Sequence, residues 1–428
     1  MQKIWIISAM MATLTYAQEI NIEEELESQK TNPAVTQSSY MPDISLILDA
    51  GYTNESLDID TDHVAIPSFI DGHGGHDEHA HYPLVGNDGF NLNYAELALE
   101  SSVDNYFDLK VVFHITEDFF ETEEAYAVTN SLPYHLKAKI GKFFSDFGYI
   151  NKIHEHAYNF VEIPLIYEVL LGGHGLVSEG VQLQYVLPTK TYIMAGVEFS
   201  QGNNEQSFGI DGFTPPGAVE DFAGVEEVSQ PSLTIAYLKT SFDISGGTVL
   251  AGLSIAQGDS RINHLEDEES PHAFAGDTTI YGADLVYKKY LSAQRAIAWQ
   301  SEYLYREMDG TQYIPEEGTW GNTLSLHKEQ GGYYTELVYQ HDRNIKAGAR
   351  YSIINQNDVM INDSLQETPD DMSITSAMAE YNFSEYSRLR LQYNYNTSLY
   401  TEEGLPNNKE EVILQFTYAI GAHGAHAF

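Results

Sequence analysis

The sequence contains no cysteine, so a disulfide framework and a cysteine-based zinc site are both excluded. Positive charge is also scarce, because 21 Lys and Arg residues stand against 63 Asp and Glu residues and give a formal net charge of −42. This charge argues against nucleic acid and against an anionic inner leaflet as partners. Small polar solutes and divalent cations remain as candidate partners, and a metal would have to be held by histidine and carboxylate groups.

Long apolar runs are absent after the N-terminus. Residues 1 to 17 combine a lysine near the start, a short apolar stretch and a small-residue end, which is the pattern of a cleaved signal peptide. Residues 18 to 42 are polar and acidic, and we expect a flexible leader there. No later run reaches the roughly 18 apolar residues that a membrane helix needs. An exported chain of this kind is either soluble or crosses a membrane as a β-barrel.

Residues 43 to 428 consist largely of segments of about ten residues in which apolar and polar side chains alternate. In one such segment Leu389 and Leu391 face one way, while Arg388 and Arg390 face the other. Strands with one apolar and one polar face are typical of a barrel whose outside meets lipid. The alternation therefore predicts an all-β fold, a transmembrane antiparallel β-barrel in the outer membrane of a bacterium.

The connections between these segments support a barrel of about sixteen strands, because short and long connections alternate strictly. Outer-membrane barrels have short periplasmic turns and long external loops. A soluble β-sandwich is the alternative, and the loop asymmetry and the 30 tyrosines argue against it. The strands are predicted to begin near residues 44, 90, 105, 121, 134, 179, 190, 231, 247, 277, 293, 332, 344, 373, 387 and 410. The predicted external loops are 51–89, 145–178, 202–230, 259–276, 309–331, 357–372 and 400–409.

Seven basic side chains fall on the polar face of predicted strands, and we expect them to line the lumen. Because these basic side chains would face acidic loops at the mouth, they would create a transverse electric field that orients polar solutes in a narrow pore. Ordinary lumen polarity without a selective role is the alternative interpretation. The seven residues are Lys110, Lys137, Lys139, Lys346, Arg350, Arg388 and Arg390.

The histidines are candidate metal ligands. Four of them crowd into DGHGGHDEHAHYPL, residues 71 to 84, whose spacing has no helical period and predicts a flexible cluster at the mouth of the barrel. Imidazole and carboxylate groups suit zinc, copper or nickel, so zinc is a candidate ligand or cargo, although no cofactor is required. Solvated loop histidines without a metal are the alternative. The candidate ligands are His73, His76, Asp77, Glu78, His79 and His81, with a second group at His154 and His156 in another predicted external loop.

The sequence contains no pattern typical of an enzyme. It lacks a G-x-S-x-G nucleophile elbow, a phosphate-binding P-loop and an H-E-x-x-H zinc motif. We therefore name no catalytic residue and predict that the protein is not an enzyme.

The stretch KIGKFFSDFGYINKIHEHA, residues 139 to 157, resembles a known family. With the surrounding residues 89 to 202 and the ending GAHGAHAF, it is similar to the proteobacterial proteins called zinc-regulated TonB-dependent outer-membrane receptors. The resemblance implies a role in the passage of zinc or a zinc-linked solute across the outer membrane. The matching residues are Lys139, Gly141, Lys142, Phe143, Phe144, Gly148, Tyr149, Asn151, His154, His156 and Ala157.

Size favours a porin within this resemblance, because TonB-dependent receptors have about 22 strands and a plug, whereas about sixteen strands use nearly all of this chain. We predict a porin-like channel for small polar solutes with a mouth that captures zinc. The first alternative is a ligand-gated or TonB-linked receptor, which would need a closed lumen, for example by residues 145–178 folding inward. The second is a surface binding protein anchored by the barrel. A homotrimer in outer-membrane lipid is the expected assembly.

Overall fold

The computed structural model describes residues 42–57, 64–69 and 88–421, except residues 118, 131, 205, 220, 221, 268, 269, 370 and 402. The predicted signal peptide and the leader up to residue 41 lie outside the described residues, so these two domain boundaries stay predictions. The long strands are β1 (Asp43–Glu55), β3 (Gly89–Ser102), β4 (Phe107–Ile115), β5 (Phe120–Thr129), β6 (Leu136–Phe144), β7 (Val177–Val186), β8 (Tyr192–Ser200), β9 (Leu233–Ile244), β10 (Gly247–His264), β11 (His272–Tyr290), β12 (Ala296–Glu316), β13 (Thr319–Gln340), β14 (Ile345–Ile361), β16 (Met372–Ser384), β17 (Ser387–Asn396) and β19 (Lys409–Gly421).

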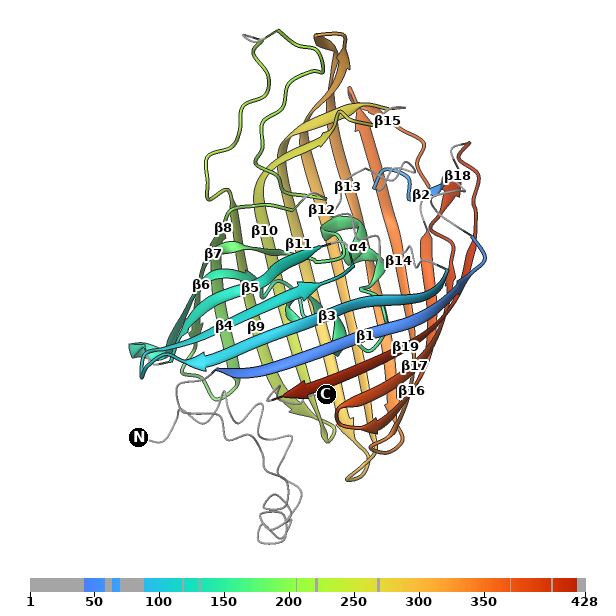
Figure 1. The fold of residues 1–428 in the computed structure, drawn as a ribbon. Helices are drawn as coiled ribbons and strands as arrows, with labels where there is room; N and C mark the ends of the chain where they lie inside the picture. Colours follow the sequence, from blue (N-terminus) through green and yellow to red (C-terminus); the bar gives the residue numbers. More distant parts are fainter. Residues whose placement is uncertain are drawn as a thin grey trace.

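These strands close into a barrel (Figure 1). One sheet of the described chain contains seventeen strands, and sixteen remain when the two-residue β15 (Ser364–Leu365), which extends the connection after β14, is set aside. Neighbouring strands pair antiparallel, and β1 pairs with β3 on one side and with β19 on the other. Because the ring closes through β1, the backbone groups of the described wall pair all the way round. The predicted all-β antiparallel barrel of about sixteen strands is confirmed.

One side of the barrel has longer strands than predicted. β10, β11, β12 and β13 contain 18, 19, 21 and 22 residues, whereas β4, β6 and β8 contain 9 each. The predicted external loops 259–276 and 309–331 are therefore wrong, since most of their residues belong to strands. The extensions persist because Phe274, Met308 and Leu326 pack together on the inner face, where they form a small core of their own.

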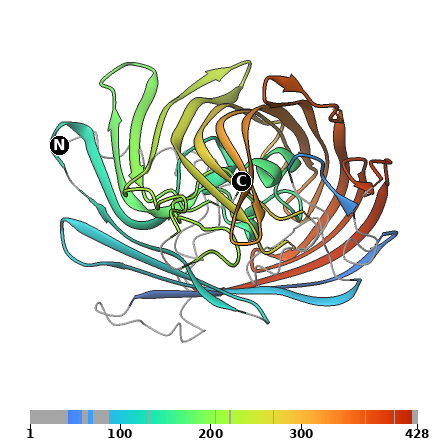
Figure 2. The same ribbon diagram turned by 90° about the horizontal axis from the view of Figure 1, so that it is seen from above.

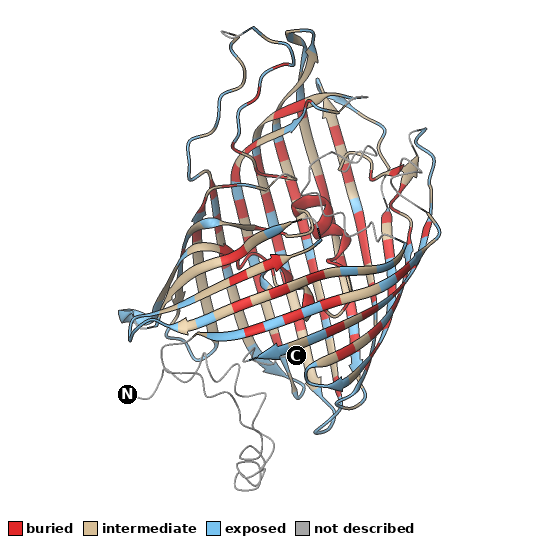
Figure 3. Ribbon diagram, in the orientation of Figure 1, coloured by how far each residue is buried: buried red, intermediate tan, exposed pale blue. Residues whose placement is uncertain are grey.

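The two faces of the barrel wall differ in polarity. On β17, Gln392 faces inward and is 0% exposed, whereas Leu391 beside it faces outward and is 50% exposed. Figure 3 shows the same alternation of buried and exposed positions along the wall strands. A polar inner face and an apolar outer face are what a barrel in lipid requires.

The connection between β6 and β7, residues 145–176, folds into the barrel, and we call it the inward segment. It contains η2 (Ile150–Lys152), η3 (Glu155–Ala157) and α4 (Leu165–Leu171), and every residue of α4 is buried. Seen from above, α4 lies within the ring of strands (Figure 2). None of the helices in the described chain is long and apolar enough to cross a membrane. The predicted external loop 145–178 is thus wrong, because its apolar run FVEIPLIYEVLL is buried in the barrel instead of being left in water.

Two further stretches reach into the lumen beside the inward segment. They are the stretch around β2 (Val64–Ala65) and the stretch that leads into β18 (Tyr400–Thr401). Val64 of β2, Ile66 just after it, and Leu399 just before β18 share one apolar cluster with Phe208 and with the side chains of the segment. β2 pairs with β18 (Tyr400–Thr401), so the two stretches also hold each other. Together they give the interior of the barrel an apolar core on the α4 side.

Candidate functional site

Asn151 joins the two ends of the inward segment. Its Nδ2 donates to the carbonyl oxygens of Ser145 at 2.9 Å and Leu176 at 3.0 Å, and its Oδ1 accepts from the Leu176 backbone N–H at 2.7 Å. Gly175 beside it has a φ of 62°, and a Cβ there would lie 2.3 Å from Asn151 Oδ1. The Ser145 backbone N–H also donates to the Leu176 carbonyl at 2.9 Å, so the amide reinforces a direct contact between the two ends, which form the neck of the segment. The close approach of Gly175 requires glycine at that position.

A buried glutamate of β12 anchors the first turn of the segment. Glu302 Oε2 accepts from the backbone N–H of Tyr149 at 2.6 Å and from the Tyr167 hydroxyl at 2.7 Å, and Oε1 accepts from the backbone N–H of Ile150 at 3.0 Å. The Tyr334 hydroxyl also donates to Oε1. Sequence reasoning did not single out this residue, because a glutamate on the polar face of one strand resembles many others in so acidic a chain.

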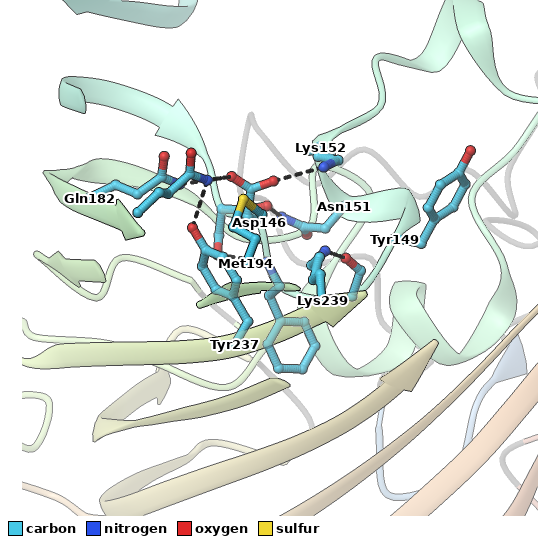
Figure 4. Close-up of polar contacts among 12 residues, drawn as sticks. Asp146, Tyr149, Asn151, Lys152, Gln182, Met194, Tyr237 and Lys239 are labelled. Carbon is cyan, nitrogen blue, oxygen red and sulfur yellow. Dashed lines mark hydrogen bonds and ion pairs between the residues drawn. The ribbon is translucent and has the colours of Figure 1, made fainter. Parts of the chain in front are cut away.

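Asp146 ties the start of the segment to the adjoining wall (Figure 4). Its carboxylate accepts from Lys152 at 2.9 Å, from Gln182 at 3.0 Å and from Gln184 at 2.7 Å. Lys239 of β9 donates to a backbone carbonyl of the same segment. Burial alone would raise the pKa of Asp146, but the nearby ammonium groups, Lys152 foremost, outweigh burial and hold that pKa well below its usual range.

Four of the seven basic residues expected in the lumen are buried and contact acids or the inward segment. Arg350 donates to the Glu162 carbonyl at 2.7 Å, and its other terminal nitrogen lies 3.1 Å from the Glu162 carboxylate. Arg390 lies 2.9 Å from the Glu380 carboxylate and donates to the Tyr158 carbonyl at 2.7 Å. The same glutamate lies 3.4 Å from Lys346 and 3.8 Å from Arg388.

The other three basic residues lie on β4 and β6. Lys110 Nζ lies 3.2 Å from Glu124 and 3.8 Å from Glu100. Lys139 Nζ lies 4.8 Å from the centres of two aromatic rings, which is a cation–π arrangement. Lys137, two residues earlier on the same face of β6, is half-buried. Most of these basic groups therefore have an acidic or aromatic neighbour, and they do not form the unpaired basic wall that a transverse field would need.

The inward segment carries His154 and His156 against glutamates of the wall. His154 Nδ1 lies 3.3 Å from Glu123 and 3.5 Å from Glu96, and its Nε2 lies 3.0 Å from Glu124. His156 Nδ1 lies 2.9 Å from Glu96. All five side chains are buried. The two histidines thus lie inside the barrel, and the prediction that they lie in an external loop is wrong. Their ring nitrogens and the glutamate carboxylates form an acidic cluster that can hold a cation.

A β-bulge explains how two consecutive glutamates face this cluster. Val112 of β4 pairs with Glu124 and Phe113 pairs with Thr122, so Glu123 of β5 has no residue opposite it. A bulge inserts an extra residue into one strand and redirects its side chains. Strict alternation would point Glu123 outward, and for that reason sequence periodicity did not find it.

The electrostatics of the cluster favour a positive charge on the inward segment. Burial alone would lower the pKa of His154, but the nearby carboxylates of Glu123, Glu124 and Glu96 outweigh burial and raise that pKa well above its usual range. The arrangement can therefore hold either a proton or a metal ion on the imidazole side. The other predicted ligands, His73, His76, Asp77, Glu78, His79 and His81, lie outside the described residues, so their role stays a prediction.

Comparisons with known proteins address the fold and the ancestry of the chain. No protein-family model matches it. An uncharacterized protein of Aquifex aeolicus (strain VF5) is 44% identical over 407 residues, which cover 95% of this chain and 84% of that protein. The solved structure of in-vitro folded OmpT, an outer membrane protein of Vibrio cholerae, has a TM-score of 0.51 at 13% identity and covers 91% of this chain and 100% of that chain. The outer membrane channel DcaP of Acinetobacter baumannii has a TM-score of 0.49 at 13% identity, covering 90% and 99%.

The likeness to OmpT shows that the described chain has the fold of an outer-membrane porin. It does not extend to a solute or a metal. The resemblance to zinc-regulated receptors stays a prediction.

Proposed function

We propose that this chain, which belongs to the same protein family as the Aquifex aeolicus protein, is a porin-like channel of a bacterial outer membrane that passes small polar solutes. The inward segment narrows its lumen. A channel of this kind acts by shape and charge and needs neither a catalytic residue nor a cofactor.

The observation that supports the proposal is a chain segment folded across the inside of a closed barrel with a polar inner face. The inward segment is held by Asn151 at its neck, by Glu302 at its first turn, and by Arg350 and Arg390 further along. Because Glu302, Arg350 and Arg390 lie on three different wall strands, the segment has a fixed place in the lumen. A fixed obstruction in a wide barrel sets the size of the solutes that pass.

Ion pairs line the interior on two sides, and this suits small polar or zwitterionic solutes. Asp146 with Lys152 lies beside β7, whereas Glu162 with Arg350 lies at β14. The Lys152 side chain is 42% exposed, so it can meet a passing solute. Paired charges of both signs attract dipolar solutes and exclude neither cations nor anions.

We also propose that the histidines and carboxylates capture a divalent transition metal, for which zinc is the best match to imidazole and carboxylate donors. The motif with His154 and His156 supports this, because both histidines reach glutamates of the wall. A homotrimer in outer-membrane lipid remains part of the proposal.

Single-channel recording in planar bilayers tests the channel. The refolded mature protein is expected to carry ohmic current, and Arg390→Glu is expected to shift the reversal potential under a salt gradient toward cation selectivity. Glu385→Lys, in the exposed turn before β17, changes charge outside the lumen and is the matched control. A folded barrel that carries no current would contradict the proposal.

A ligand-gated receptor is the second candidate, and the apolar core of the lumen favours it. Val64, Ile66, Phe208 and Leu399 pack on the inward segment in the way that the interior of a closed barrel would. Under this reading current appears only when a bound ligand displaces the segment. A folded barrel that binds zinc and stays closed in the recording would support it.

A further inference from the structure

We propose that the lumen contains a specific binding site for one divalent ion such as zinc, with His154 Nδ1, Glu96 and Glu123 as the protein ligands. This inference rests on the proposed function, since it names the metal-binding part of that channel. It places the ion at the junction of the barrel wall and the inward segment.

The separations between the donor atoms match those around a tetrahedral ion. Ligand atoms about 2.0–2.1 Å from zinc in tetrahedral geometry lie roughly 3.3 Å apart. His154 Nδ1 lies 3.3 Å from Glu123 Oε2 and 3.5 Å from Glu96 Oε2. His156 lies beside these ligands, and its Nδ1 is hydrogen-bonded to Glu96 Oε2 at 2.9 Å, which holds that carboxylate in place. Ligand atoms of Glu96, Glu123 and His154 all lie within 4.8 Å of one another, so a single ion can reach each of them.

Two of these atoms are buried and make no hydrogen bond with the described residues. They are His154 Nδ1 and Glu123 Oε2, on side chains that are 7% and 5% exposed. A buried polar atom without a hydrogen bond is unfavourable, and native structures seldom leave one. Two such atoms that face each other at 3.3 Å are explained if a cation lies between them.

Glu124 supports the imidazole of His154 from its other side. His154 Nε2 lies 3.0 Å from Glu124 Oε2, and an N–H there would leave Nδ1 as the free lone pair that a metal requires. Glu124 is itself held, because Lys110 lies 3.2 Å from Oε2 and the backbone N–H of Phe144 donates to Oε1 at 3.3 Å. A carboxylate that orients a ligating histidine is the usual surrounding of a metal site.

The negative charge of the cluster also favours the binding of a divalent cation. The carboxylates of Glu96, Glu123 and Glu124 gather round the two imidazoles, and Lys110, 3.2 Å from Glu124, also lies 3.8 Å from Glu100. A divalent cation adds two positive charges among these buried carboxylates. Buried charges are favourable only when they are paired or coordinate a metal.

The ligands come from two different parts of the chain, and this gives the ion a structural effect. Glu96 belongs to β3 and Glu123 to β5, whereas His154 belongs to the inward segment. A bound ion therefore joins the segment to the wall on the side opposite α4's strands β12 to β14. We expect zinc to raise the thermal midpoint of the barrel and to reduce current noise from movement of the segment.

Zinc binding to the full mature chain tests the site. In the background variant His73, His76, His79 and His81 are changed to Ala, so that these predicted ligands cannot bind zinc. This background is expected to retain one zinc per chain after gel filtration, and cobalt in its place is expected to show the absorption of a tetrahedral site. Adding Glu123→Gln is expected to weaken zinc binding at least 100-fold. Glu385→Gln in an exposed turn is the matched control and should bind like the background.

Glu124→Gln separates the site from a fault in folding, because Glu124 orients a ligand and does not bind the ion. It is expected to weaken zinc binding 10–100-fold while keeping the cobalt spectrum. Folding of each variant is checked by the heat-dependent shift of the barrel on gels. The inference is overturned if the folded background binds no zinc, or if Glu123→Gln binds zinc like the background. Current in the metal-free protein without zinc binding would overturn only this site, and zinc binding without current would overturn only the channel.

Discussion

Replacing Glu302 with alanine should release the first turn of the inward segment and widen the channel. The carboxylate accepts hydrogen bonds from the backbone N–H groups of Tyr149 and Ile150 and from the hydroxyls of Tyr167 and Tyr334. All four donors lose their acceptor in Glu302→Ala. None of the other side chains is changed, so the effect isolates the anchor.

The size of the effect follows from the number of donors. A buried donor left without an acceptor costs about 1–3 kcal/mol. Water that enters the space left by the carboxylate favours the low end, so four donors give about 4 kcal/mol. Since each 1.4 kcal/mol is a factor of ten, the attached state of the first turn is weakened on the order of 10³-fold. Frequent excursions to a higher-conductance state are expected at this magnitude.

Planar-bilayer recording of wild type and variant measures this directly. The control is Glu307→Ala, which removes a glutamate from the same strand β12 at a position of the opposite parity, away from Glu302. The control should keep the wild-type distribution of current levels. A Glu302→Ala variant with an unchanged distribution and an unchanged thermal midpoint would show that the segment is not held by this carboxylate.

Three further predictions concern the inward segment. Gly148→Ala should lower the urea midpoint of unfolding more than Gly404→Ala. Both glycines have positive φ, but a Cβ at position 148 would lie 2.0 Å from Tyr167 Oη, whereas nothing lies within 4 Å of a Cβ at position 404. Equal midpoints for the two variants would contradict this prediction. Asn151→Asp should loosen the neck of the segment, since a carboxylate cannot donate to the two carbonyls that the amide reaches, and faster cleavage of the segment by protease is the measurement. Burial and the nearby charges of Glu155 and Glu162 raise the pKa of Glu168 well above its usual range. The folded state therefore keeps a proton that the unfolded chain loses, and the free energy of unfolding should fall as pH rises above the ordinary pKa of glutamate. Glu168→Gln should remove that fall, and urea midpoints at pH 4 and pH 8 that differ equally in both proteins would refute the assignment.

The candidate site was only partly predictable. The motif that ends in His154 and His156 was recognised, and the structure shows what several of its residues do: Gly148 makes room for Tyr167, and Asn151 joins the neck. The glutamates that meet the histidines were not recognised. Glu96 and Glu123 lie 58 and 31 residues before His154 in the sequence. Only the pairing of the strands places their carboxylates beside the His154 ring.

The sequence by itself determined the barrel, because alternation of apolar and polar residues is a local property of each strand and repeats along the chain. Strand starts at residues 44, 247 and 387 were predicted within a residue of where β1, β10 and β17 begin. The direction of the connection after β6 was decided by tertiary structure alone. Its apolar run could be buried by folding inward or by a partner outside, and only the closed ring supplies acceptors such as Glu302 for its backbone. The histidine cluster depends on the same choice, because His154 meets Glu123 only when the segment turns inward and the bulge in β5 turns the glutamate toward it.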